Sequence, residues 1–480
     1  MGFELTGHHA TSGKYKILAL ALLIFIALKF FDLQVFLADM PKEFVQTQTT
    51  YAQVQATHQY FSPYFFKSTY RYTLTGIAPL FILQKLISPQ FLFIILSVVI
   101  FILAWRLGGG AGLRPMGAIA LAFFVAHFYN FFLIQFEDRA FAFLFFYIYL
   151  LWHLDEFLLA FRTGKWRPQF FISLLLLIFC WEQWLDLLPG ILLFCWLARK
   201  YYRSPGLYYK TSALYLFCAL FYLLLRFSLI GDLGELKREA EQAFIFSHHG
   251  IFYAVEDFVT GAIKFISTAF ANLWPSLAPH PSVVASYKGP QIFTDVQDDF
   301  FLLPDYLYFN YLYNWYIYVG IWFAIFIWGV AKIFKNLKHM CQSDNATRYF
   351  TLVLILFSCL GLFSGFGHWF VRFRPYLSQP FYYNYKSIIG VVAMSLLWAF
   401  AFEQLWYRAS FPFFKWSKTK LKTTRYLALM LILIMTYGGY HKAYIALNNI
   451  QVYDKFNSFR VPSHFSCRKN LRQEKCDGTL

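Results

Sequence analysis

The sequence predicts an all-α protein, a polytopic transmembrane helical bundle of about 11 spans. Hydrophobic residues make up 59% of the 480 residues and charged residues only 14%, which leaves too little polar surface for a soluble protein. Apolar runs of roughly 20 residues, the length that crosses a bilayer, recur along the chain. Lys and Arg gather in the short segments between these runs, as they do in multi-pass membrane proteins.

The apolar runs give the candidate spans in chain order. The first, at about 16–36, is read as a retained helix because no signal-peptide cleavage pattern follows it. The second, 76–105, is predicted to break near Ser88 and Pro89. The segment 169–198 is either one long tilted helix or two shorter helices that meet near Glu182 and Asp186. The remaining candidates are 116–134, 139–158, 211–230, 313–333, 349–366, 386–405 and 424–442.

Five basic segments between the spans predict the orientation of the chain. They are "RLGGGAGLR", "FRTGKWR", "ARKYYR", "KIFKNLKH" and "KWSKTKLKTTR", and the candidate spans place all five on one side, which the positive-inside rule assigns to the cytoplasm. The N-terminus is then cytoplasmic and the C-terminus extracytoplasmic. Residues 1–442 form a single transmembrane domain, and 443–480 form a polar extracytoplasmic tail. The external loops are at about 37–75, 231–312 and 367–385, with amphipathic helices at the membrane interface.

The net charge of +17 would suggest nucleic-acid binding in a soluble protein. Here the basic residues follow the membrane topology, so we expect membrane lipids and no nucleic acid as partners. Two cysteines of the tail, Cys467 and Cys476, can pair if the tail faces an oxidising compartment. The other five are read as small hydrophobic residues: Cys180, Cys195, Cys218, Cys341 and Cys359.

Acidic residues at the predicted outer ends of spans are candidates for catalysis. Asp32 ends the first span and Asp39 follows it; a carboxylate at the membrane–water boundary is suited to a general base. Glu137 and Asp138 lie in a tight external turn between two spans, where both can reach a cation or a sugar phosphate. The alternatives are ordinary interface residues for the first pair and a helix start, stabilised by the helix dipole, for the second.

Basic residues on the predicted external side run against the positive-inside trend. The loop "GHWFVRFRPYLSQPFYYNYK" concentrates them, and guanidinium groups suit phosphate or pyrophosphate. The alternative is contact with lipid head groups of the outer leaflet. The candidate phosphate ligands are His368, Arg372, Arg374, Lys386 and, near the outer end of 211–230, Arg226.

The layout of residues 1–400 resembles the GT-C membrane glycosyltransferases, polytopic enzymes that use a polyprenyl-phosphate sugar donor on the extracytoplasmic or lumenal side. The similar features are a cytoplasmic N-terminus, a first span that ends in an acidic residue, acidic residues in the second external loop, and the stretch "FRTGKWRPQFFISLLLLIFCWEQWLDLLPGILLFCWLARKYYR". The resemblance implies sugar transfer to a lipid-linked or cell-envelope glycan, in the bacterial inner (cytoplasmic) membrane. It implies Asp32 or Asp39 as general base, Glu137 and Asp138 as ligands of the acceptor or a divalent cation, and His368, Arg372 and Arg374 as ligands of the donor phosphate.

Other functions stay open. A polytopic transporter or flippase predicts charges within several helices and discontinuous helices near the membrane midplane. Most non-basic charges are expected on the external side instead, which favours an enzyme with a one-sided active site. A membrane O-acyltransferase is a third possibility, with His368 or His127 as base. A non-catalytic assembly subunit is a fourth.

Overall fold

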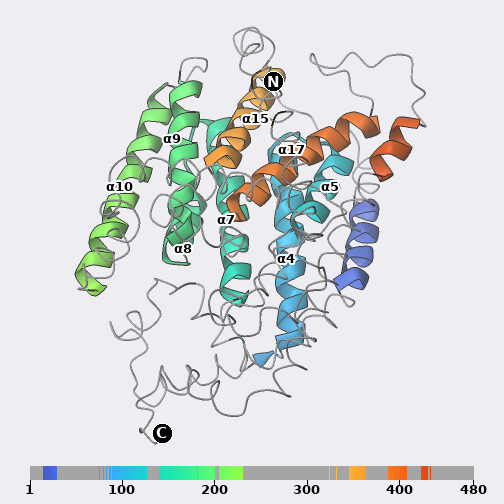
Figure 1. Ribbon diagram of the computed structural model, residues 1–480, viewed down its shortest axis with the longest axis horizontal. Helices are drawn as coiled ribbons and strands as arrows, with labels where there is room; N and C mark the ends of the chain where they lie inside the picture. The colour runs from blue at the N-terminus through green and yellow to red at the C-terminus, as the bar shows by residue number, and fades with distance from the viewer. Residues whose placement is uncertain are drawn as a thin grey trace, which may run out of the picture.

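A computed structural model of the chain is helical in every described element (Figure 1). Among the described residues, four helices are long and apolar enough to cross a membrane, or five if a bent helix pair is counted as one span. The predicted all-helical, multi-pass membrane architecture is therefore confirmed for this part of the chain. Besides single positions, the structure describes residues 15–29, 89–126, 140–180, 182–199, 205–230, 345–363, 388–407 and 423–430.

The main helices coincide with predicted spans. Four of them begin with proline, which suits the first helical position because it has no N–H to satisfy there. The predicted break near Ser88 and Pro89 is confirmed in that α4 begins at Pro89. The bounds are α4 Pro89–Gly110, α5 Pro115–Ala126, α7 Ala140–Thr163, α8 Pro168–Cys180, η1 Glu182–Asp186, α9 Leu187–Ala198, α10 Pro205–Ile230, α15 Asn345–Phe363 and α17 Ile388–Tyr407.

The helices pack in a continuous series. α4 contacts α5 and α7, α7 contacts α8, α5 contacts α17, α17 contacts α15, and α15 contacts α9, which contacts α10. α4 and α5 pack closely near the turn that joins them. Gly108 has no room for a side chain, because a Cβ there would lie 2.8 Å from Cα of Ala118. Small residues at such contacts let membrane helices associate through close packing.

The segment 169–198 is a bent pair, so the alternative of one long helix is wrong. The helical segments Pro168–Cys180 and Gln183–Ala198, the second of which contains most of the short helix η1 and all of α9, are bent by 119° relative to one another. Phe194 in α9 lies beside Phe161, near the end of α7, and beside Tyr208, near the start of α10. Because α8 begins directly after the loop that follows α7, the pair enters the bundle and returns toward the same end.

Contacts between helix ends define that end, which we call the basic end. Arg114 precedes α5 and pairs with Glu403 in the last turns of α17, and the Tyr349 hydroxyl near the start of α15 donates to the carbonyl of Gly110. In Figure 1 these helix ends lie at the top of the view. Among the described residues, the basic segments 106–114 and 161–167 therefore adjoin one end of the bundle, and its assignment to the cytoplasm stays a prediction.

Candidate functional site

The residues predicted to carry the chemistry lie almost entirely outside the described residues. Arg226 falls within α10, and its side chain is not among those described. The other predicted site residues are outside the described residues, so the structure does not test how close together they lie, and their roles remain predictions. They are Asp32, Asp39, Glu137, Asp138, His368, Arg372, Arg374 and Lys386, together with His127, the external loops, the tail and most of the span 313–333.

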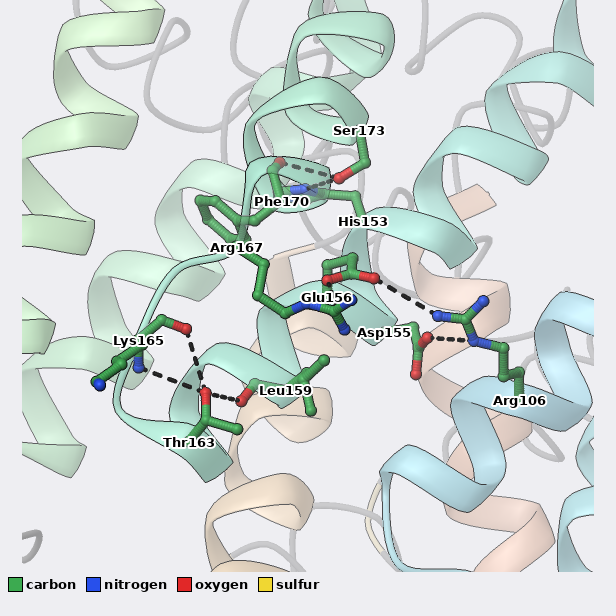
Figure 2. A network of polar contacts seen from close by, with 10 residues as sticks. All are labelled: Arg106, His153, Asp155, Glu156, Leu159, Thr163, Lys165, Arg167, Phe170 and Ser173. Atoms are coloured by element: carbon green, nitrogen blue, oxygen red, sulfur yellow. Dashed lines mark hydrogen bonds and ion pairs between the residues drawn. The ribbon is translucent and has the colours of Figure 1, made fainter.

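A group of four charged side chains occupies the basic end instead, and we call it the ionic cluster (Figure 2). Arg106 on α4 contacts Asp155 on α7, with Nε 2.9 Å from Oδ2. Its Nη2 donates to Oε1 of Glu156 at 3.5 Å. Arg167, in the loop before α8, lies 3.9 Å from Oε2 of Glu156. The cluster joins α4 and α7 to the loop that begins α8.

Burial within the ionic cluster is uneven. The side chains of Asp155 and Glu156 are 10% and 2% exposed, whereas those of Arg106 and Arg167 are 51% and 49% exposed. Buried carboxylates are costly to desolvate, so the ion pairs compensate that cost. The two arginines reach over the carboxylates from the solvent-facing side.

A cavity of about 390 Å³ opens beside the ionic cluster. Two of its lining residues each have an enclosed side-chain oxygen without a hydrogen-bond partner in the described part of the chain: Oε2 of Glu156, which lies 3.9 Å from Arg167, and Oε1 of Gln169. Unsatisfied buried acceptors are unusual and mark a place where a donor is expected. The lining residues are Leu103, Arg106, Trp152, Glu156, Arg167 and Gln169.

A second charged pair ties the α4–α5 turn to α17. Oε2 of Glu403 accepts a hydrogen bond of 2.6 Å from the backbone N–H of Arg114, and the Arg114 side chain lies 4.0 Å from Oε1. The Arg114 guanidinium also sits over the ring of Tyr407, 5.0 Å from its centroid. Glu403 is buried, so it acts as a fixed acceptor that anchors the start of α5.

A buried histidine joins α7 to α8 and α10. Nδ1 of His153 lies 3.0 Å from Oγ of Ser173, and Nε2 contacts the hydroxyl of Tyr215. Because the Ser173 hydroxyl donates to the carbonyl of Phe170, its oxygen is left to accept from Nδ1–H, and Nε2 then accepts from Tyr215. A neutral imidazole satisfies all three contacts. The Ser173 hydroxyl donates its proton to a backbone carbonyl. His153 is therefore a structural link between helices and not a base that activates a serine nucleophile.

These charges were missed as candidates in the sequence, although a signal was present. "HLDEF" and "AFEQLW" place carboxylates inside apolar runs, and charges in such positions are rare and usually paired. Asp155, Glu156 and Glu403 lie at the basic end, and the expectation that most non-basic charges gather on the external side stays a prediction. The three carboxylates lie at the basic end because each compensates an arginine of a basic loop.

The remaining predictions on small groups have mixed outcomes. Cys180, Cys195 and Cys359 are buried and Cys218 is half-buried, which confirms their interpretation as small hydrophobic residues. Within the described ranges, no three His, Cys, Asp or Glu side chains are arranged to hold a metal ion. The predicted cation ligands, Glu137 and Asp138, are outside the described residues.

Comparisons with protein families, curated proteins and solved structures found no match for this chain.

Proposed function

We propose that the protein is a membrane glycosyltransferase of the bacterial inner membrane. It would move a sugar from a polyprenyl-phosphate donor to a lipid-linked or cell-envelope glycan acceptor on the extracytoplasmic face. The proposal includes the predicted topology, with about 11 spans, a cytoplasmic N-terminus and an extracytoplasmic C-terminus.

The observation that supports the proposal is that ion pairs hold the helix ends together at the basic end. Asp155, Glu156 and Glu403 each have an arginine partner there. Carboxylates held in this way fix helix ends, because each is engaged by an arginine on a neighbouring segment. A fixed basic end supports a reaction at the opposite face, where the sequence predicts acidic residues and externally placed arginines.

The proposed reaction is inverting sugar transfer. Asp32 or Asp39 takes the proton of an acceptor hydroxyl, whose oxygen attacks the anomeric carbon of the donor sugar. The bond from that carbon to the phosphate oxygen breaks, and polyprenyl phosphate leaves with the electron pair. Arg372 and Arg374, with Arg226, hold the developing phosphate charge. Glu137 and Asp138 orient the acceptor or a divalent cation.

The test is transfer of labelled sugar from polyprenyl-phosphate donors to lipid or glycan, in membranes that contain the full-length protein. The variants are Asp32→Asn, Asp39→Asn and Glu137→Gln, and Glu474→Gln of the predicted tail is the matched control. We expect transfer by the wild type and by the control, and a loss of about 100-fold or more in at least one of the first two variants. Transfer that survives in all three variants would contradict the assigned roles.

A second candidate function is transport of a lipid-linked or envelope component, and the bent pair α8–η1–α9 favours it. Non-helical backbone at membrane depth is tolerated where protein covers it or where it lines a cavity, and discontinuous helices form the substrate sites of many transporters. Movement of the labelled polyprenyl-phosphate sugar across sealed vesicles, without transfer to an acceptor, would identify a transporter. Transfer without such movement would identify the enzyme.

A further inference from the structure

Two arginine side chains line the cavity beside the ionic cluster and keep donors available for a ligand. Arg106 uses Nε for Asp155 and Nη2 for Glu156, so its Nη1 makes no hydrogen bond within the described part of the chain. Nη1 of Arg167 is 3.9 Å from Oε2 of Glu156, which is too far for a hydrogen bond. A guanidinium has five N–H donors, and no group among the described residues accepts one from the Arg167 side chain.

The carboxylates of the ionic cluster are less accessible than the arginines. Asp155 and Glu156 are enclosed, whereas Arg106 and Arg167 are half-exposed. A ligand that enters the cavity therefore reaches guanidinium groups and not the carboxylate oxygens. The carboxylates hold the arginines near the cavity before any ligand binds, which lowers the entropy cost of binding.

The charges around the cavity favour an anion. Within the ionic cluster two arginines balance two carboxylates, and the segment 162–167 adds two exposed cations, Arg162 and Lys165, and no acidic residue. The exposed guanidinium groups lie nearer to a ligand than the enclosed carboxylates do, so attraction exceeds repulsion. Guanidinium groups suit phosphate oxygens in particular, because their parallel N–H donors match two oxygens at once.

The position of the cavity indicates that the phosphate belongs to a lipid. Arg106 lies about one turn before the end of α4, whose segment Phe91–Gly110 is a candidate span, so the cavity is at the level of lipid head groups. Half-buried Leu103 and Trp152 form an apolar wall of the same cavity. Basic pockets between membrane helices bind anionic head groups, and tryptophan is favoured at this depth.

We propose that this cavity binds the phosphate of an anionic phospholipid, of the phosphatidylglycerol class, in the membrane leaflet at the basic end. Arg167 and Nη1 of Arg106 hold the phosphate oxygens, and Trp152 and Leu103 contact the glycerol and the first carbons of the acyl chains. The enclosed carboxylates position the arginines and do not touch the lipid. The site does not depend on the proposed sugar transfer.

The test measures apparent dissociation constants of single lipids for the purified full-length protein by native mass spectrometry. The probes are phosphatidylglycerol, phosphatidylcholine and free glycerol 3-phosphate. Phosphatidylcholine is the matched ligand, because it has the same phosphodiester and a choline cation that cancels its net charge. We expect phosphatidylglycerol to bind about fivefold tighter than phosphatidylcholine, the scale of one charge beside a basic residue at a membrane surface. Free glycerol 3-phosphate, which lacks acyl chains, should bind more weakly than either lipid.

Variants assign the binding to this cavity. Arg167→Gln should weaken phosphatidylglycerol about tenfold, the scale of one charge-assisted hydrogen bond. Gln169→Glu keeps the size of a half-buried lining residue, so it should fold normally, and its negative charge should remove the preference for phosphatidylglycerol. The control is Lys210→Gln, which removes an exposed charge near the start of α10.

The start of α10 lies at the same end of the bundle, since the ring of Tyr208 contacts that of Phe161 near the end of α7. Lys210 does not line the cavity, so the control should bind both lipids as the wild type does. Three results would overturn the proposal: equal binding of the two lipids by the wild type, a preference that survives both cavity variants, or free glycerol 3-phosphate that binds as tightly as phosphatidylglycerol.

Discussion

Nε of Arg106 lies 2.9 Å from Oδ2 of Asp155 and joins the end of α4 to α7. Gly110 completes this contact, because a Cβ at its position would lie 2.7 Å from Oδ1 of Asp155. The helix end, the glycine and the ion pair thus depend on one another. The contact brings Asp155, a carboxylate within an apolar run, against Arg106 of the basic segment 106–114.

Replacing Arg106 should destabilise the bundle. Arg106→Ala leaves Asp155 without its 2.9 Å partner and removes one of the two arginines near Glu156, while both carboxylates stay buried. We expect a loss of about 1–3 kcal/mol, below the value for a fully buried pair because Arg106 is half-exposed. Thermal unfolding in detergent measures it, with exposed Arg162→Ala as the matched control. Equal effects of the two variants would show that the ion pair contributes nothing.

Two adjacent glycines of α4 should respond in opposite ways. Gly108→Ala places a Cβ 2.8 Å from backbone Cα of Ala118, so α4 and α5 must separate, at a cost of about 1–3 kcal/mol. At Gly109 a Cβ meets nothing within 4 Å, so Gly109→Ala should be neutral or more stable through helix propensity. The melting temperatures of the two variants in one detergent give the comparison. A Gly108→Ala protein as stable as Gly109→Ala would contradict the close packing of α4 on α5.

The tyrosine that contacts the buried histidine should be essential for stability. Tyr215→Phe removes the donor to Nε2 of His153 in a fully buried position, and an unsatisfied buried acceptor costs about 1–3 kcal/mol. Tyr209→Phe on the same helix removes only the exposed contact with Arg199 and should change stability by less than about 0.5 kcal/mol. Denaturation curves of both variants provide the measurement, and similar midpoints would refute the proton arrangement described for His153.

The sequence predicted the spans well because their signal is local. An apolar run of sufficient length, with proline at its start and a basic loop at its end, specifies a membrane helix whatever its neighbours are. The break at Pro89 and the described cysteines were predicted for the same reason. The direction of α9 could not be predicted in this way, since it depends on the contact of Phe194 with Phe161 and Tyr208.

The ionic cluster could not be predicted because its partners are distant in sequence. Arg106 and Glu156 are 50 residues apart, and Arg114 and Glu403 are 289 apart. Composition shows that such charges need partners, and only packing decides which ones they obtain. The predicted catalytic residues belong to predicted external loops and span ends, where apolar periodicity gives no positional information, so their proximity remains a prediction.

The short helix η1 of the bent pair contains a buried glutamine, Gln183, whose side-chain amide can be replaced as a test of the packing. Gln183 is buried in η1 and neither of its side-chain polar atoms has a hydrogen-bond partner in the described part of the chain. Gln183→Met should keep or raise stability, because it removes unsatisfied polar atoms at nearly constant volume. Gln183→Glu should lower it by burying a carboxylate. Thermal unfolding decides the matter, and a strong loss in Gln183→Met would reveal a partner for the amide.

The proposed sugar-transfer site depends on which faces of the membrane hold the basic end and the long external loops. The most direct test is labelling of single cysteines by a membrane-impermeant thiol reagent in intact cells and after permeabilisation. The variants are Ser62→Cys in the predicted loop 37–75 and Lys165→Cys at the basic end, with Cys341, Cys467 and Cys476 replaced by serine. The account predicts labelling of Ser62→Cys in intact cells and of Lys165→Cys only after permeabilisation. Labelling of both positions from the same face would contradict it.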